Sequence, residues 1–325
     1  MLYTVLQILA LAALGFFLTR LWGWSQNFFQ SLSRLLVNVV LPIYFFARIS
    51  QTDVSDLRRG FFFPLAAMLV IGAGLLFSSI ISSVVGLKGK EKRAAVALSG
   101  FGNSGIVPLM LIESFPATVP QVADTFGTLM PTMFVGVYLL FQSPVLWSLG
   151  NYLVAGEVKK PRWNELLTPP LLGILAGFIF LIPPLQRLLL NPVLPFTSLL
   201  NAAHRLGQGV FPLLLLCLGS IIAALKGRVE RQTGLALATA AVVRFTLIPA
   251  CFFAVYFLFL KDLHLSPAVL WVLFLETHTP PATALAIMSM GKNDAVVSPV
   301  LLWTYIAYLA VLPAYLLLFL SLPGL

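Results

Sequence analysis

Charge is scarce in this chain. Only 10% of its 325 residues are Asp, Glu, Lys or Arg, whereas a soluble domain carries about a quarter. Apolar residues make up 59%, and the mean hydropathy is +0.98. This balance excludes a soluble domain, so the net charge of +9 does not indicate a nucleic-acid partner. The composition predicts an all-α integral membrane protein in contact with lipid.

Cysteine and the motifs of intramembrane enzymes are also rare or missing. Cys217 and Cys251 both lie in apolar runs, so we expect free thiols and neither a disulfide framework nor a metal site. The chain has no HExxH motif, its aspartates fall in the connections, and Ser104 has no histidine in its own half. We therefore expect no enzyme and no cofactor. Rings of one residue type, as in a channel, are absent too, which favours a carrier.

Ten apolar windows of about 20 residues predict ten membrane spans, at roughly 2–20, 30–50, 61–87, 92–115, 122–149, 166–185, 196–225, 233–260, 267–290 and 295–320. No basic residue precedes the first window, which we interpret as a membrane helix and not a cleaved signal peptide. The odd-numbered connections hold thirteen Lys and Arg residues and the even-numbered ones five. The positive-inside rule then predicts a cytoplasmic linker at 151–165 and both termini outside.

The linker divides the chain into two predicted five-span repeats, 1–150 and 166–325. Pro212 follows Pro42 by 170 residues, and Pro281 follows Pro108 by 173, so the second and seventh spans correspond, as do the fourth and ninth. Because five is an odd number, the two repeats must have opposite orientations. Such inverted repeats, with interrupted spans at matching positions, are typical of secondary transporters.

The fourth and ninth spans are the interrupted ones. Glycines permit an unwound backbone, Asn, Ser or Thr can cap a helix, and proline belongs in the first turn. We therefore expect new half-helices to start near Pro108 and, with Thr279 as the cap, near Pro280 or Pro281. Two half-helix N-termini that meet at the midplane form an anion site. The expected substrate-binding residues are Asn103, Ser104, Gly105, Ile106, Val107, Pro108, Thr279, Pro280, Pro281 and Ala282.

Ionisable groups at membrane depth are costly and usually functional. Arg244 lies in the middle of the eighth span, and Glu276 and His278 lie at the ninth break. Glu276 is either the carrier of a coupling proton or the counter-ion of Arg244. For His278 a hydrogen-bonded place in the linker is favoured over a proton relay. His204 and Arg205 are expected to face the bundle or a vestibule.

These motifs resemble a known family. Asn103-Ser104-Gly105 followed by Pro108-Leu109 is similar to the fourth-helix motif of the auxin efflux carriers, which include plant PIN-formed carriers and bacterial permeases within the bile/arsenite/riboflavin transporter grouping. The resemblance extends to Thr279-Pro280-Pro281-Ala282, Gly291-Lys292-Asn293-Asp294, Leu41-Pro42, Gly219, Arg244 with Pro249, and Leu312-Pro313. The gap from Asn103 to Pro108 is two residues shorter than in many members, and Glu276 and His278 depart from the family pattern. The long central loop of many plant members is missing, which indicates a compact prokaryotic member of the inner membrane.

The resemblance implies crossed fourth and ninth helices and a carboxylate-bearing substrate near the crossing. It also implies a scaffold of helices 1, 2, 6 and 7, a mobile transport unit of helices 3–5 and 8–10, an elevator-type mechanism and a homodimer. We therefore expect a secondary transporter of small organic anions. The alternative is a sodium-coupled symporter of the bile-acid type, because Asn103, Ser104, Glu276 and Thr277 could supply oxygens to a hard cation.

Overall fold

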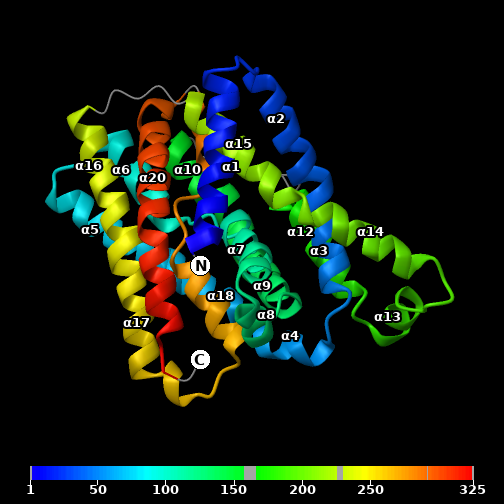
Figure 1. Ribbon diagram of the computed structural model, residues 1–325. Helices are drawn as coiled ribbons and strands as arrows, with labels where there is room; N and C mark the ends of the chain where they lie inside the picture. Colours follow the sequence, from blue (N-terminus) through cyan, green and yellow to red (C-terminus); the bar gives the residue numbers. More distant parts are fainter. Residues whose placement is uncertain (1, 157–165, 225–229, 291, 324–325) are drawn as a thin grey trace. The chain divides into compact units, whose positions relative to one another are not determined.

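The computed structural model describes residues 2–156, 166–224, 230–290 and 292–323, and every regular element within these ranges is helical (Figure 1). Six helical segments are long and apolar enough to cross a membrane, or seven if one bent pair forms a single span. The chain is thus an all-helical integral membrane protein. The first, fourth and ninth predicted spans include the shorter apolar helices Leu6–Arg20, Ile106–Pro116 and Pro267–Thr277. The predicted linker residues 157–165 and Gly291 lie outside the described residues.

The chain divides into two compact units, which are described separately. Unit 1 comprises Met1–Phe63, Leu109–Leu140 and Leu167–Ala224. Its elements are α1 (Leu2–Arg20), α2 (Gln26–Leu35), η1 (Leu36–Val40), α3 (Leu41–Ile49), α4 (Val54–Gly60), most of α7 (Ile106–Thr118), α8 (Pro120–Phe126), most of α9 (Leu129–Val145), α12 (Pro169–Ile179), α13 (Pro183–Leu189), α14 (Phe196–Gln208) and α15 (Val210–Ala224).

Small residues let the helices of unit 1 approach closely. A Cβ atom on Gly219 of α15 would lie 1.9 Å from the Ala12 carbonyl oxygen of α1, and one on Gly15 would lie 2.0 Å from the Leu216 oxygen. Such backbone contact is the usual way in which membrane helices associate, because lipid provides no hydrophobic drive. α3 packs in the same unit against α12 and α14.

Unit 2 comprises Pro64–Pro108, Phe141–Leu166 and Leu225–Leu325. Within it α16 packs against α6 and α20; Figure 1 shows α16 and α17 in yellow beside the orange and red α20. Its elements are α5 (Phe63–Val84), α6 (Gly89–Gly100), η2 (Leu146–Gly150), α10 (Asn151–Ala155), α16 (Arg231–Val242), η3 (Val243–Leu247), α17 (Ile248–Leu258), η4 (Leu260–Asp262), α18 (Pro267–Thr277), α19 (Ala284–Ser289) and α20 (Asp294–Leu320).

Prolines set local irregularities in both units. Pro42 and Pro249 are the second residues of α3 and α17, and each follows a π-helical turn, η1 or η3. Proline lacks the N–H that would continue an α-helix, and a wider π turn absorbs the mismatch. The turn η3 contains Arg244 and so positions the residue for the site described below.

Two predicted span boundaries were wrong. The sixth span was expected to run continuously over 166–185, but α12 ends at Ile179 and α13 leaves it at 103°. The cause is the Pro183-Pro184 pair, which starts a new helix because neither residue can donate to the preceding turn. The fifth span was expected to end at 149, yet α10 continues the helix to Ala155, so the predicted linker begins inside it.

Candidate functional site

The fourth and ninth spans are both broken, and in unit 2 the two breaks contact each other. α6 ends at Gly100 and α7 begins at Ile106, which leaves a first linker at 101–105. α18 ends at Thr277 and α19 begins at Ala284, which leaves a second linker at 278–283. Gly102 and Pro281 pair in an isolated antiparallel bridge.

Backbone hydrogen bonds join the two linkers on both sides of this bridge. Asn103 N donates to Pro280 O at 2.8 Å, and Ala282 N donates to Phe101 O at 2.9 Å. Unwound backbone at membrane depth is tolerated only where its polar groups are satisfied by protein or a wet cavity. The bridge satisfies part of that requirement and fixes the two breaks against each other.

One of the two expected half-helix starts was wrong in register. α7 begins at Ile106, so Pro108 lies in its first turn as expected, but α19 begins at Ala284, beyond both prolines. Pro280 and Pro281 are therefore extended linker residues and not first-turn residues. Their missing N–H groups explain why no helix forms there. Thr279 does not cap a helix either, because its hydroxyl donates back to Glu276 O at 3.3 Å.

Arg244, which lies in η3, positions the second linker through hydrogen bonds. Its side chain is fully buried, and Nε and Nη2 donate to the Thr279 carbonyl at 2.9 and 2.6 Å. Nη2 also donates to the Thr279 hydroxyl. Gly102 makes room for this arrangement, since a Cβ atom there would lie 2.1 Å from Nη2 and 2.2 Å from Thr279 Oγ1. The sequence placed Arg244 in the middle of the eighth span, and the structure shows that it binds the second linker at Thr279.

Glu276, in the last turn of α18, is 1% exposed, and neither carboxylate oxygen accepts a hydrogen bond from a described residue. The Ser104 hydroxyl on the first linker lies beside it, outside hydrogen-bonding geometry, and is itself 2% exposed and without a partner. Arg244 acts on the carboxylate electrostatically while donating to Thr279. Buried polar groups are nearly always hydrogen-bonded, so this pair of unsatisfied side chains indicates a ligand site.

Backbone donors at the two helix starts are also unsatisfied. The N–H groups of Ser104, Gly105 and Ile106 before and at the start of α7 donate no hydrogen bond within the described part of the chain. The same holds for Thr283 and Ala284 at α19.

Not every expected donor is available, however. Val107 N donates to Asn103 O, Ala282 N is used in the bridge, and Pro108 has no N–H. The two dipoles are unequal as well, because α7 has 13 residues and α19 only six. We expect α7 to contribute most of the positive potential.

Asn103 differs from its expected role. The sequence suggested an amide free to reach the ligand, but Asn103 Nδ2 donates to the Tyr305 hydroxyl of α20 at 2.6 Å. Gln142, which is 2% exposed, donates to Gly102 O at 2.7 Å. Sequence reasoning missed Gln142 and Tyr305. In the sequence they stand out only as polar residues within apolar spans, and many residues without a role at the site share that property.

His278 is a hydrogen-bonded linker residue. Its Nδ1 donates to Phe274 O at 2.7 Å, and its ring packs against the rings of Phe252, Phe274 and Tyr315, with centroids 5.6, 4.1 and 4.7 Å away. An aromatic enclosure of this kind disfavours a charged imidazole. His278 therefore anchors the end of α18 and adds no charge to the break.

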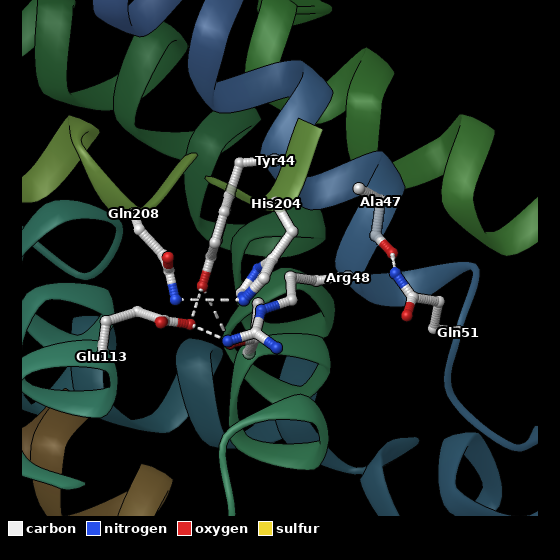
Figure 2. Close-up of polar contacts among 8 residues, drawn as sticks. Tyr44, Ala47, Arg48, Gln51, Glu113, His204 and Gln208 are labelled. Carbon is white, nitrogen blue, oxygen red and sulfur yellow. Dashed lines mark hydrogen bonds and ion pairs between the residues drawn. The ribbon is translucent and has the colours of Figure 1, made fainter. Parts of the chain in front are cut away.

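Unit 1 contains a second polar cluster that the sequence did not reveal. Arg48 of α3 forms an ion pair with Glu113 of α7, and the Tyr44 hydroxyl also donates to Glu113 (Figure 2). Figure 2 shows His204 and Gln208 of α14 directed toward this pair, 3.2 Å apart between their Nε2 atoms. Arg48 had been assigned to a connection, but it is only 8% exposed in the last turn of α3. The available signal was Glu113, a carboxylate within the apolar fourth span.

Comparison with known proteins gives a consistent result. Residues 1–316 match a family described as membrane transport protein. The chain is similar to Protein PIN-LIKES 7 of Arabidopsis thaliana, with 23% identity over 98% of this chain and 96% of the relative. Protein PIN-LIKES 5 of the same plant is 22% identical over the same shares. An uncharacterized transporter of Methanothermobacter thermautotrophicus is 25% identical over 54% of this chain and 56% of its own length.

Proposed function

We propose that this chain is a secondary transporter of small organic anions. The premise is that it belongs to the membrane transport protein family of auxin efflux carriers and PIN-like transporters. The observation that carries the proposal is the set of unpaired N–H groups at two bridged helix breaks, next to the buried Ser104 hydroxyl. Donors in this arrangement suit the oxygens of a carboxylate.

The substrate carboxylate accepts hydrogen bonds from the N–H groups of Ser104, Gly105 and Ile106 on one side. Thr283 and Ala284 supply donors on the other side, and the Ser104 hydroxyl completes the set. Arg244 contributes a full positive charge behind the second linker, where it is buried. In a region of low dielectric this charge is weakly screened and favours an anion over a neutral ligand.

The finer architecture belongs to the same proposal. Ten membrane helices form two inverted five-helix repeats, and the fourth and ninth helices cross at their breaks. Helices 1, 2, 6 and 7 form a scaffold, and helices 3–5 and 8–10 carry the substrate in an elevator-type movement. The offset of the matching prolines and the presence of a break in each repeat support this arrangement. The charge bias supports termini outside, and the family resemblance supports a homodimer in a prokaryotic inner membrane.

Binding measurements on the purified protein test this proposal. Acetate, benzoate and indole-3-acetate are compared with acetamide, benzamide and indole-3-acetamide, which keep the shape and lose the charge. At least one acid should bind, and its amide should bind at least tenfold more weakly. The proposal is contradicted if no acid binds, or if an amide binds as well as its acid.

A sodium-coupled symporter of the bile-acid type is the second candidate. It is favoured by Glu276, whose carboxylate oxygens accept no hydrogen bond and lie beside the Ser104 hydroxyl. Carboxylate and hydroxyl oxygens are suitable ligands for a hard cation. An uptake assay on the reconstituted protein, with sodium replaced by choline, separates the two candidates. A sodium-coupled carrier stops accumulating the acid that binds, whereas the carrier proposed above continues to accumulate it.

A further inference from the structure

The charges around the two breaks balance before any ligand is present. At a pH above that at which Glu276 loses its proton in the empty site, Arg244 contributes one positive charge and Glu276 one negative charge, and both side chains are at most 1% exposed. His278 donates from Nδ1 to a carbonyl within an aromatic enclosure and is neutral. Two further titratable groups near Arg244, Tyr305 and Tyr308 of α20, are phenols that stay neutral at ordinary pH.

Binding of a carboxylate disturbs this balance. A second negative charge would enter a region where the existing carboxylate already lacks any hydrogen-bond donor. Among the described residues, Ser104 and Arg244 are the groups of other elements that act on Glu276, and Arg244 donates several hydrogen bonds to Thr279. Two carboxylates in one buried site cannot both stay ionised, since like charges at close range in low dielectric repel strongly.

We propose that Glu276 takes up one proton when a monovalent carboxylate binds at the breaks, so that the chain couples the movement of one anion to one proton. This inference rests on the proposed function. A proton from solution adds to one Glu276 oxygen, and the substrate enters as its anion. The site then holds Arg244 with one positive charge, a neutral Glu276 and one substrate charge, so its net charge is unchanged.

Protonation also resolves the missing hydrogen bond. A protonated carboxyl has one O–H donor, and the neighbouring Ser104 oxygen or the substrate carboxylate can accept it. Above the pH at which Glu276 loses its proton in the empty site, the affinity for the carboxylate should fall about tenfold per pH unit. This is the linkage expected for uptake of one proton.

Calorimetry tests this directly. The heat of carboxylate binding is measured in two buffers of different ionisation enthalpy, and the difference gives the number of protons taken up. Acetate, benzoate and indole-3-acetate serve as probes. At a pH at which Glu276 is ionised in the empty site, wild type should take up one proton per bound anion. Glu276→Gln should keep binding and take up none, and Glu276→Asp should again take up one. Glu230→Gln, the same change at the exposed start of α16, should behave as wild type.

The outcomes separate the two proposals. Failure of every acid to bind wild type overturns the proposed function and this inference with it. Binding without proton uptake in wild type overturns only the inference, as does undiminished uptake in Glu276→Gln. Sodium uptake in place of a proton also overturns it and supports the sodium-coupled alternative.

Discussion

Two buried polar clusters use the same residue types in opposite ways. In unit 1, Arg48 and Glu113 pair directly, and Tyr44 donates to the same carboxylate. In unit 2, Arg244 donates to Thr279, and the Glu276 carboxylate has no hydrogen-bond partner among the described residues. In the first cluster the carboxylate has a charge partner and hydrogen-bond donors without a ligand, although Arg48 Nε and His204 Nδ1 have no partner among the described residues; in the second the carboxylate has no donor. The difference indicates that the first cluster stabilises the fold and that the second is the candidate ligand site.

Energetics support this division. A buried ion pair is strongly destabilised when one partner is removed, because the other charge is then left uncompensated. The buried Glu276 carboxylate lacks a hydrogen-bond donor, and the fold tolerates such a group only for some other benefit.

The largest effect should come from breaking the completed pair. Glu113→Gln leaves Arg48 buried and uncompensated and should cost about 3–5 kcal/mol of stability. Glu276→Gln removes no hydrogen bond and should leave stability unchanged or raised. Thermal unfolding in mild detergent measures both. The double variant Arg48→Met, Glu113→Met is the control and should recover most of the loss. Equal destabilisation by the two Gln variants would remove the contrast between the clusters.

The second prediction concerns the support of Arg244. Gly102→Ala puts a Cβ atom 2.1 Å from Arg244 Nη2, so the guanidinium must leave Thr279. Carboxylate affinity should fall at least tenfold, or about 1.4 kcal/mol. Gly72→Ala on α5 is the matched control, since its Cβ would meet nothing within 4 Å, and it should bind as wild type. Normal affinity in Gly102→Ala would show that Arg244 does not support the anion.

Ser104 should have a smaller effect. Loss of its hydroxyl removes one donor to the anion, so Ser104→Ala should weaken carboxylate binding by roughly 1 kcal/mol. Ser99→Ala, also buried on the same broken span, loses only a bond to Ala95 O and should leave the affinity unchanged. Titration calorimetry measures both variants. If Ser99→Ala weakens binding as much as Ser104→Ala, the Ser104 hydroxyl does not contact the ligand.

The smallest effect should come from the residues that position the first linker. Asn103→Ala and Tyr305→Phe each remove the bond between these side chains and should weaken binding by about 0.5–1.5 kcal/mol. Because both changes remove the same interaction, the double variant should bind the carboxylate no more weakly than the single variant with the lower affinity. Tyr308→Phe on α20 is the control. Strictly additive effects would show that Asn103 acts on the ligand and not through Tyr305.

The sequence predicted the helical membrane class and the location of both breaks, because local chemistry determines these features. Glycine and proline interrupt a helix wherever they lie, and an apolar run of 20 residues is long enough to span a bilayer. The start of the second new helix, α19, was wrong in register, since Pro281 pairs with Gly102 of a distant segment. That pairing depends on tertiary contact and overrides the preference of proline for a first turn.

Partners distant in the sequence were beyond local reasoning. Asn103 and Tyr305 are 202 positions apart, and Arg48 and Glu113 are 65 apart. Each residue is recognisable as a polar group in an apolar span, but its partner depends on how the helices pack. Whether Glu276 is the counter-ion of Arg244 or the carrier of a coupling proton was open for the same reason. The sequence therefore located the candidate site and could not give its bonding.

A crystal structure with bound 4-bromobenzoate would show which of the two clusters holds the anion, because anomalous scattering from bromine locates the ligand without ambiguity. The account predicts the carboxylate within hydrogen-bonding distance of the Ser104–Ile106 N–H groups and the Ser104 hydroxyl, with the Arg48–Glu113 pair intact. A carboxylate bound instead to Arg48, with Glu113 displaced, would contradict the account and make the cluster of unit 1 the anion site.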